Sequence, residues 1–589
     1  MRPQQSGDPV LRWTTDDDGF FAAPADSEIY TTKPGAGGVE LKLLANLSAA
    51  QQTALKTTAC SATLTGDTCA QARIDWLRGD RSKEGSAGSL RARSKLLGDI
   101  IDSSPAYMPQ ANAIFVGSND GMLHAFDAGS GRELFAYMPS DALTRAYKLT
   151  SPNYSHEYFV DGDITISNPA ISAGRSILVG ALGRGGRGLF ALNVSSPSSF
   201  GASDVLWEFS DADLGNVLGK PFIAKLNNGV TAVVVGNGPN SATDRAFLFV
   251  INAATGALIR KIDTGAGSST ASNGLSSPNG SDLDGNGTID VVYAGDLLGN
   301  VWKFDLSSGS AASWGSAFAS GGSPAPLFVA KDASNNRQPI TAMIELGLNA
   351  RSGDANFGKR FLFFGTGRYL TTSDVSSNAV QSWYGLIDGA TTISGRSALR
   401  QRTIALQETV AGKTARGFSL AAGNDMSGQR GWYIDFTTVG GAATGERVIS
   451  ASKYYGNALM VSSIVPSTNQ CVPGGSGFLN AIDPFTGGAL DSPFFDANGD
   501  GLFNNSDRIG SGAAGTSNAR RAIGSIDQGI GLLGEGALIG KKVFSGGTGT
   551  AGDNDAATPC SSGDTHCRPL GVDPKLRTGR IAWRELVRD

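Results

Sequence analysis

The sequence is poor in the residues that zinc centres and many hydrolytic sites require. The 589-residue chain has three histidines and five cysteines, and none of the cysteines forms a Cys-x-x-Cys pair. A zinc site therefore has few ligands to draw on, and no Ser-His-Asp grouping supports nucleophilic catalysis. We expect a protein that is not an enzyme.

Positive charge and long apolar runs are also scarce. Charged residues make up 17% of the chain, the net charge is −4, and no run of Lys and Arg is sustained. A protein that binds a phosphate backbone needs a basic face, so nucleic acid is not an expected partner. No stretch reaches the roughly 18 apolar residues of a membrane span, so no transmembrane segment is predicted.

The few cysteines indicate an oxidising compartment. Four of them form two closely spaced pairs in loop-like sequence, Cys60 with Cys69 and Cys560 with Cys567, and Cys471 is left over. Short-range disulfides of this kind are typical of exported proteins. The first residues lack the apolar core of a signal peptide. We therefore interpret the chain as an exported fragment, or the mature product, of a longer precursor.

Glycine, by contrast, is abundant, with 80 residues, and hydrophobic residues make up 40% of the chain. Glycines between short β-branched and aromatic runs indicate many tight turns and short strands. One unit recurs: an apolar strand that ends in Gly, a polar turn, and a second strand that leads into Asp or Asn and a Gly-containing turn. It occurs at residues 113–131, 176–194, 232–256, 290–309, 361–389 and 458–487, with a seventh candidate at 431–450.

Repeated strand pairs of this kind predict the blades of a β-propeller. We expect an all-β fold over residues 96–589, a modified propeller of about seven blades that is similar to those of quinoproteins. Two stacked β-domains are the main alternative. The strand predicted at 580–586 could close the ring by pairing with an early strand, which would hide exposed strand edges.

Residues 1–95 lack the repeat. A helix is predicted at 48–58, because Ser48 can cap it, and another near 71–77. We expect this segment to be a small, partly helical linker. It contains the tripeptide Arg78-Gly79-Asp80, which integrins can bind on an exposed loop, although a helix that ends at its glycine explains the same residues.

The strongest local motif is SDLDGNGTIDVVYAGD, which begins at residue 281. Relative positions 1, 3, 5 and 9 are Asp282, Asp284, Asn286 and Asp290. Gly287 at position 6 allows a sharp turn, and the carbonyl of Thr288 would supply position 7. This is the ligand spacing of an EF-hand-like loop, in which alternate residues turn hard oxygens toward Ca²⁺. The sequence therefore predicts a calcium site here.

The motif departs from an EF-hand after Asp290, because the chain continues directly into a predicted strand. Tyr293 occupies position 12, where an EF-hand has Glu. We expect weaker binding, or replacement of the missing ligand by water or by Asp296. The alternative is a turn rich in Asp and Asn that satisfies only its own backbone.

A second loop, FFDANGDGLFNNSD, shows similar spacing. Its predicted ligands at positions 1, 3, 5, 7 and 12 are Asp496, Asn498, Asp500, the carbonyl of Leu502 and Asp507. Asp is shorter than Glu and would bind through one oxygen at position 12. This is a second, weaker candidate for calcium.

Several stretches resemble the C-terminal region of the PilC/PilY family of bacterial type IV pilus proteins, and they follow the family order. They include LGDIIDSSP from residue 97, VGSNDGMLHAFDA from 116, DLDGNGTIDVVYAGDLLGNVWKFDL from 282, FFGTGRYL from 363 and WREL from 583. The resemblance implies a modified propeller with one calcium site, in the loop that begins at Asp282.

The resemblance also implies a function. Members of the family act at the pilus tip, the outer membrane or cell surface, or the periplasm, in pilus biogenesis, twitching motility and adhesion, and their calcium occupancy is linked to pilus extension and retraction. The expected partners are pilin and minor pilins, and host-cell or abiotic surfaces. Two alternatives are a quinoprotein-like propeller dehydrogenase and a host-receptor adhesin without a role in motility.

Overall fold

The computed structural model describes residues 21, 26–85, 89–468, 474–513, 515–548 and 567–573. The described chain divides into two compact units. The first holds the residues up to 292 together with 304–315, and the second holds 293–303 together with the residues from 316 onward. Among the described residues, no helix combines the length and the apolar character that crossing a membrane would require.

The first sheet belongs to the first unit and has six strands in the order β2-β1-β6-β5-β4-β3. Its strands are β1 (Ile29–Lys33), β2 (Gly37–Glu40), β3 (Ala106–Met108), β4 (Ala113–Gly117), β5 (Leu123–Asp127) and β6 (Glu133–Met138). Strands β3 to β6 form an antiparallel meander, and β1 adds to β6 in parallel. Residues on both sides of position 95 thus share one sheet, and the domain boundary placed there stays a prediction.

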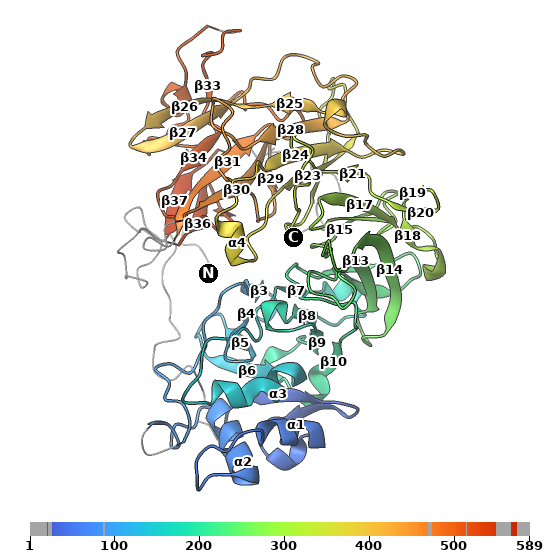
Figure 1. The fold of residues 1–589 in the computed structure, drawn as a ribbon, viewed down its shortest axis with the longest axis vertical. Helices are drawn as coiled ribbons and strands as arrows, with labels where there is room; N and C mark the ends of the chain where they lie inside the picture. The colour runs from blue at the N-terminus through green and yellow to red at the C-terminus, as the bar shows by residue number, and fades with distance from the viewer. Residues whose placement is uncertain are drawn as a thin grey trace. The chain divides into compact units, whose positions relative to one another are not determined.

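Helices of the first unit lie together beside this sheet (Figure 1). They are α1 (Ala49–Leu55), α2 (Gly66–Leu77) and α3 (Ser140–Leu149). The predicted cap is confirmed: Ser48 Oγ accepts the N–H of Gln51 at 3.3 Å, and Gln51 Oε1 accepts the N–H of Ser48 at 3.0 Å. The helix ends at Leu55 rather than 58, and α2 begins five residues before the predicted 71.

The predicted disulfide between Cys60 and Cys69 is confirmed, and it ties the segment after α1 to α2. The side chains of the predicted pair Cys560 and Cys567, and that of Cys471, lie outside the described part of the chain, as does the predicted closing strand at 580–586.

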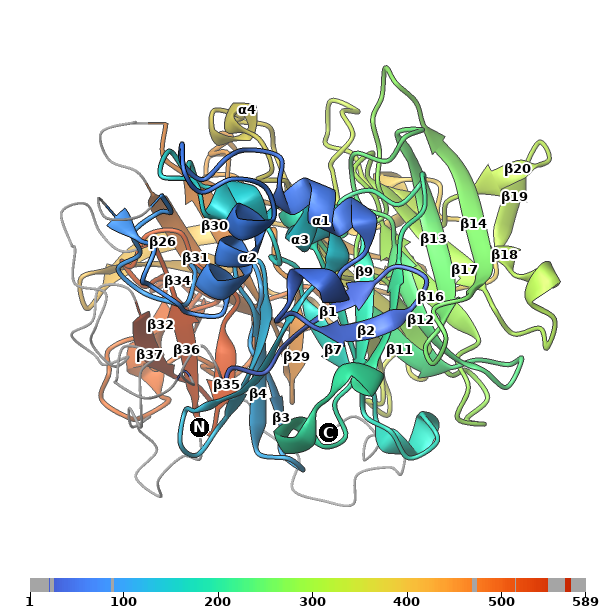
Figure 2. The ribbon, with the colours of Figure 1, turned by 90° about the horizontal axis from the view of Figure 1, so that it is seen from below.

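Two four-stranded antiparallel sheets follow in the first unit. The strands of the second sheet are β7 (Ile164–Ile166), β8 (Ile177–Ala181), β9 (Leu189–Asn193) and β10 (Val205–Phe209), and those of the third are β11 (Phe222–Lys225), β12 (Thr231–Gly236), β13 (Arg245–Asn252) and β14 (Leu258–Gly267). Figure 2 shows the third sheet. The repeats predicted at 176–194 and 232–256 are the central pairs β8–β9 and β12–β13.

The fourth sheet contains the chain crossings between the two units. It runs β15-β16-β17-β18, with β21 also paired to β17. Its strands are β15 (Asn279–Ser281), β16 (Val291–Gly295), β17 (Asn300–Asp305), β18 (Gly315–Ser316) and β21 (Phe328–Val329). The connection from β15 to β16 is the predicted calcium loop.

The second unit has two larger sheets, in the orders β22-β23-β24-β28-β25 and β26-β27-β34-β31-β30-β29. The first contains β22 (Glu345–Leu348), β23 (Arg360–Gly365), β24 (Ser382–Ile387), β25 (Arg400–Arg402) and β28 (Gly431–Asp435). The second contains β26 (Ile404–Val410), β27 (Lys413–Phe418), β29 (Lys453–Tyr455), β30 (Ala458–Pro466), β31 (Gly475–Ile482) and β34 (Ser525–Asp527).

Shorter elements complete the described part of the second unit. They are β19 (Phe318–Ser320), β20 (Ser323–Ala325), α4 (Thr372–Val375), β32 (Arg508–Ile509), β33 (Arg521–Ala522), β35 (Ala537–Ile539), β36 (Lys542–Gly546) and β37 (Cys567–Gly571). The seventh repeat expected at 431–450 is wrong, because β28 pairs with β24 and β25 and not with a strand of its own hairpin. It belongs to the same sheet as the repeat at 361–389.

A tryptophan–glycine contact recurs between successive sheets within each unit. The indole N–H of Trp207 in β10 and that of Trp432 in β28 each donate to the carbonyl three residues before a glycine, at 2.9 and 2.7 Å. These glycines, Gly256 and Gly487, have φ of +73° and +70°, and an added Cβ would come within 2.7 and 2.5 Å of the indole. The repeated Gly-containing turn thus leaves room for an aromatic ring of the preceding sheet.

Candidate calcium site

The loop between β15 and β16, residues 282–290, is closed by its last residue. The backbone N–H of Asp290 donates to the Ser281 carbonyl at 3.0 Å, and its Oδ2 accepts the N–H of Leu283 at 2.7 Å. Asp290 is 6% exposed, whereas Asp284 near the tip is exposed. The loop is therefore anchored at its buried end and open to solvent at its tip.

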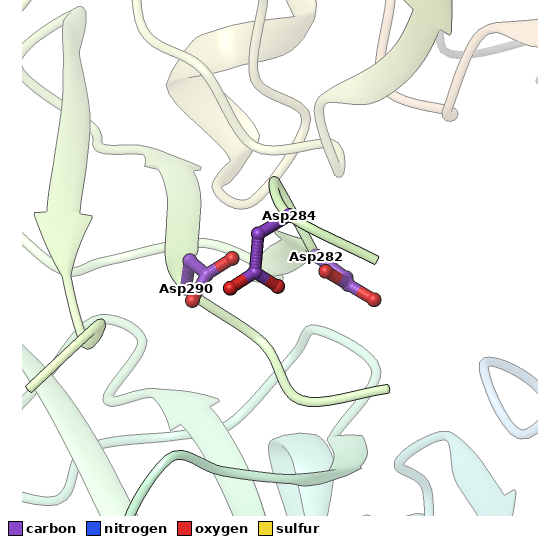
Figure 3. Close-up of side chains that lie close together, drawn as sticks. All are labelled: Asp282, Asp284 and Asp290. Atoms are coloured by element: carbon purple, nitrogen blue, oxygen red, sulfur yellow. The ribbon is translucent and has the colours of Figure 1, made fainter. Parts of the chain in front are cut away.

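Three carboxylates of this loop converge. One oxygen of each of Asp282, Asp284 and Asp290 lies within 4.8 Å of the others, and Figure 3 shows the three groups close together. Over the described residues, no other group of three acidic, histidine or cysteine side chains meets this spacing. Three like charges so close repel one another, and a bound cation relieves that repulsion.

Backbone N–H groups of the loop hold Asp282 in place. Its Oδ1 accepts from Gly285 at 2.5 Å and its Oδ2 from Gly287 at 2.9 Å. The two glycines have φ of +83° and +86°, a conformation that glycine adopts without strain. Burial by itself would raise the pKa of Asp282, but the hydrogen bonds from Gly287 and Gly285 outweigh it and hold this pKa below its usual value. The carboxylate is therefore ionised at neutral pH.

The donor set fits calcium. Ca²⁺ takes about six to eight hard oxygens, and the loop offers three carboxylates, the side-chain oxygen of Asn286 and the carbonyl of Thr288. Asn286 Oδ1 accepts the N–H of Thr288 at 2.7 Å, so a hydrogen bond connects these two predicted ligand residues. Carboxylate oxygens that accept one hydrogen bond keep a lone pair for a metal. The same residues can thus form a turn that satisfies its own backbone and also bind a metal. The ligand set stays a prediction.

Position 12 supplies no carboxylate. Tyr293 is buried, and its hydroxyl donates to Asp388 at 2.8 Å. Asp296, which we considered as a replacement, is also buried and closes the turn between β16 and β17, where it accepts the N–H of Leu298 and the indole N–H of Trp302, both at 2.9 Å. It does not belong to the acidic group. Water remains the expected replacement for the missing ligand.

A residue outside the motif supports the loop. Asn227 lies in the turn between β11 and β12, and its side-chain amide donates to Asp290 Oδ1 at 3.0 Å and to the Ile289 carbonyl at 3.1 Å. Its Oδ1 accepts the hydroxyl of Thr288 at 2.8 Å. Sequence reasoning missed this residue, because Asn-Asn-Gly at 227–229 is typical of any turn and lies far from the loop along the chain.

The second predicted loop contains Asp496, Asn498, Asp500, Leu502 and Asp507. Asp496 and Asp507 are 8% and 0% exposed, and both accept backbone N–H groups. Asp500 and Leu502 are exposed. These aspartates do not form an acidic group of the kind described above, although all three lie within the described residues. A metal at this loop stays a prediction.

The tripeptide Arg78-Gly79-Asp80 ends helix α2. The N–H of Gly79 donates to the Trp76 carbonyl at 3.0 Å, and Gly79 has a φ of +103°. Arg78 is buried, and its guanidinium donates to the Leu41 carbonyl at 3.1 Å. An integrin needs the arginine on the surface, so the helix-end interpretation accounts for this segment.

Comparisons with known proteins indicate a single family. A family model described as the PilY1 beta-propeller domain matches residues 97–421, which include the predicted calcium loop. A type IV pilus biogenesis factor PilY1 homolog from Xylella fastidiosa is 38% identical over 555 residues, covering 88% of this chain and 41% of that protein. PilY1 from Pseudomonas aeruginosa strain PAK is 34% identical over 590 residues, covering 88% of this chain and 48% of that protein. The chain thus spans less than half the length of these relatives.

A solved structure supports the same fold. The crystal structure of the Pseudomonas aeruginosa PilY1 C-terminal domain aligns with 78% of this chain and 92% of that domain, with a TM-score of 0.59 and 30% identity. The expected β-propeller is therefore confirmed, while the number of blades, about seven, stays a prediction.

Proposed function

The chain belongs to the PilY1 family of type IV pilus proteins, and on that premise we propose that it supports pilus biogenesis as a calcium-binding, non-enzymatic protein of the cell surface. The observation that carries the calcium part is the convergence of Asp282, Asp284 and Asp290 within 4.8 Å. The pilus part rests on the family and on relatives named as type IV pilus biogenesis factors.

In this proposal, the loop changes its conformation when calcium binds or leaves. A bound Ca²⁺ would neutralise the carboxylates and draw the loop together. Asp290 keeps the base of the loop fixed, since it is buried and hydrogen-bonded at both its backbone and its side chain. Asp284 and Asn286 are exposed at the tip, so they are the ligands that are freest to move. Loss of the ion leaves three mutually repelling charges, which loosens the tip.

We place this switch in pilus extension, twitching motility and surface adhesion, at the pilus tip or outer surface. The propeller would be a rigid platform, and the loop would change the contacts that the platform makes with pilin and minor pilins. Host-cell and abiotic surfaces are further proposed partners. The Asp496 loop is a second candidate calcium site in this proposal.

Calorimetry tests the calcium part. The purified, metal-stripped chain is titrated with Ca²⁺ beside an Asp284→Ala variant, and we expect a saturable site in the parent that disappears in the variant. No binding by the parent would refute the calcium site.

The pilus part needs a test in the host bacterium. Asp284→Ala is introduced into the gene, and surface pili and twitching zones are measured together with the amount of protein exported. We expect fewer pili or smaller twitching zones at an unchanged protein level. Normal pili and motility with a variant that has lost calcium would separate the ion from pilus function.

A further inference from the structure

Asn227 is the point at which the β11–β12 turn of the third sheet meets the calcium loop. Besides its bonds to Thr288, Ile289 and Asp290, its amide donates to the Leu306 carbonyl, which follows β17, at 3.2 Å. One half-buried side chain thus contacts the loop and the end of a strand of the fourth sheet. An ordinary turn asparagine bonds only to its own backbone.

Backbone contacts run beside this side chain. The N–H of Ile289 donates to the Lys225 carbonyl at 3.0 Å, and Ile289 forms a parallel bridge with Leu226. The second half of the loop therefore lies against the end of β11, whereas Asp284 at the exposed tip accepts hydrogen bonds from Asn286 within the loop. Within the loop, the half that carries Thr288 and Asp290 is the part that bonds to the β11–β12 turn region.

Resting on the calcium site proposed above, we propose that Asn227 is a positioning residue for that site. It holds Asp290 and Thr288 in position to bind the ion. Through it, calcium binding at the loop also stabilises the sheet of β11 to β14. The two oxygens of Asp290 accept hydrogen bonds from two different residues, Oδ1 from Asn227 at 3.0 Å and Oδ2 from Leu283 at 2.7 Å. With both bonds present, the buried carboxylate has one orientation.

An amide suits this position better than a charged group. It donates to Asp290 and accepts from Thr288 without adding a fourth negative charge beside the three carboxylates. Residues that orient metal ligands in this way typically change metal affinity by about 10–100-fold when they are removed.

The test compares Asn227→Ala with Asn228→Ala in the full chain. Asn228 lies in the same turn but caps it, since its Oδ1 accepts the N–H of Val230 at 3.1 Å. Calcium affinity is measured by calorimetry on metal-stripped protein. We expect about 10–100-fold weaker binding in Asn227→Ala and an unchanged affinity, within about twofold, in Asn228→Ala.

Hydrogen exchange followed by mass spectrometry supplies a readout that a merely structural role would not move. In the parent and in Asn228→Ala, we expect calcium to slow exchange in peptides that cover residues 222–236. In Asn227→Ala at saturating calcium, this protection of β11 and β12 should be lost while protection of the loop itself remains. Equal protection in both variants would overturn the proposed coupling.

The outcomes separate this inference from the function on which it rests. If the parent binds no calcium, the calcium site itself fails. If the parent binds and Asn227→Ala binds equally well, only the role of Asn227 fails. Should Asn227→Ala not fold, Thr288→Val decides in the exchange measurement, because it keeps the shape of the side chain and removes the hydroxyl that bonds to Asn227 and to Asn286. Loss of the calcium-dependent protection of β11 and β12 in that variant, with protection of the loop retained, supports the proposal, and unchanged protection of β11 and β12 overturns it.

Discussion

The two loops with calcium-like spacing both give their aspartates backbone N–H groups to accept, but they differ in whether the carboxylates converge. In the Asp282 loop, the carboxylates turn toward one another, and a side chain from a different sheet supports one of them. In the Asp496 loop, Asp496 accepts the N–H groups of residues 499–501, and Asp507 accepts those of Ala497 and Asn504. The same residue types at similar spacing thus bring three carboxylates together in one loop and not in the other.

Within the loops, the buried Asp507 and the exposed Asp284 have different roles. Asp507 is fully buried, and so is Ala497, whose N–H it accepts at 2.8 Å. A buried N–H needs a partner whether or not an ion is present. Asp284, by contrast, is exposed, and its oxygens accept the backbone N–H and the side-chain amide of Asn286 two residues later. Removal of the Asp284 carboxylate should therefore destabilise the fold little, and we expect this carboxylate to matter for ion binding.

The largest expected effect concerns stability. Asp507→Ala removes the acceptor of two backbone N–H groups, and we expect it to lower the free energy of unfolding by about 2–4 kcal/mol, with or without calcium. Asp284→Ala should change the stability of the calcium-free chain by less than about 0.5 kcal/mol, as surface substitutions usually do. Denaturant unfolding in the presence of a chelator measures the free energy of unfolding of both variants. An Asp507→Ala variant that is as stable as Asp284→Ala would contradict the expected difference between the loops.

The next effect concerns affinity. Asp284→Ala deletes a converging carboxylate, and we expect calcium to bind at least about 100-fold more weakly, a loss at or beyond the upper end of the range for residues that merely orient ligands. Replacement of the exposed aspartate of the other loop, Asp500→Ala, should leave this binding event unchanged. Calorimetry with both variants decides, and equal losses would show that the loops form one coupled system.

A smaller effect sharpens the comparison at the second loop. We expect binding there to be at least about tenfold weaker than at the Asp282 loop, because the carboxylates of the Asp496 loop do not converge. Such a second event would persist in Asp284→Ala and vanish in Asp500→Ala. Two sites of equal affinity in the parent would contradict the ranking of the loops.

The smallest effect is the pH dependence of the calcium-free loop. The folded pKa of Asp282 is depressed, so its contribution to stability is present above the unfolded value of about 3.9 and is lost as pH falls through the folded pKa. We expect the stability difference between the parent and Asp282→Asn to shrink below about pH 4. Unfolding midpoints measured between neutral and acid pH test this, and a difference that grows on acidification would contradict it.

Local patterns predicted well where the physics is local. Ser48 begins its helix because the cap involves only residues three positions apart. The repeat at 232–256 is the antiparallel pair β12–β13, and its two strands follow each other directly along the chain. The seventh repeat at 431–450 failed for the opposite reason. Strand β28 pairs with β24, which comes earlier in the chain, and with β25 in parallel, and pairings of this kind leave no periodic signal.

By itself, the sequence determined the kind of site that the Asp282 loop can form. The oxygen ligands and the glycine needed for the turn lie within one short stretch, and a short chain with that spacing has few ways to arrange itself. Only the tertiary structure decided that Asp290 is buried and accepts a hydrogen bond from Asn227, and that the carboxylates of the Asp496 loop do not converge. Both outcomes depend on which other strands pack against a loop, and those contacts join residues that the chain itself keeps far apart.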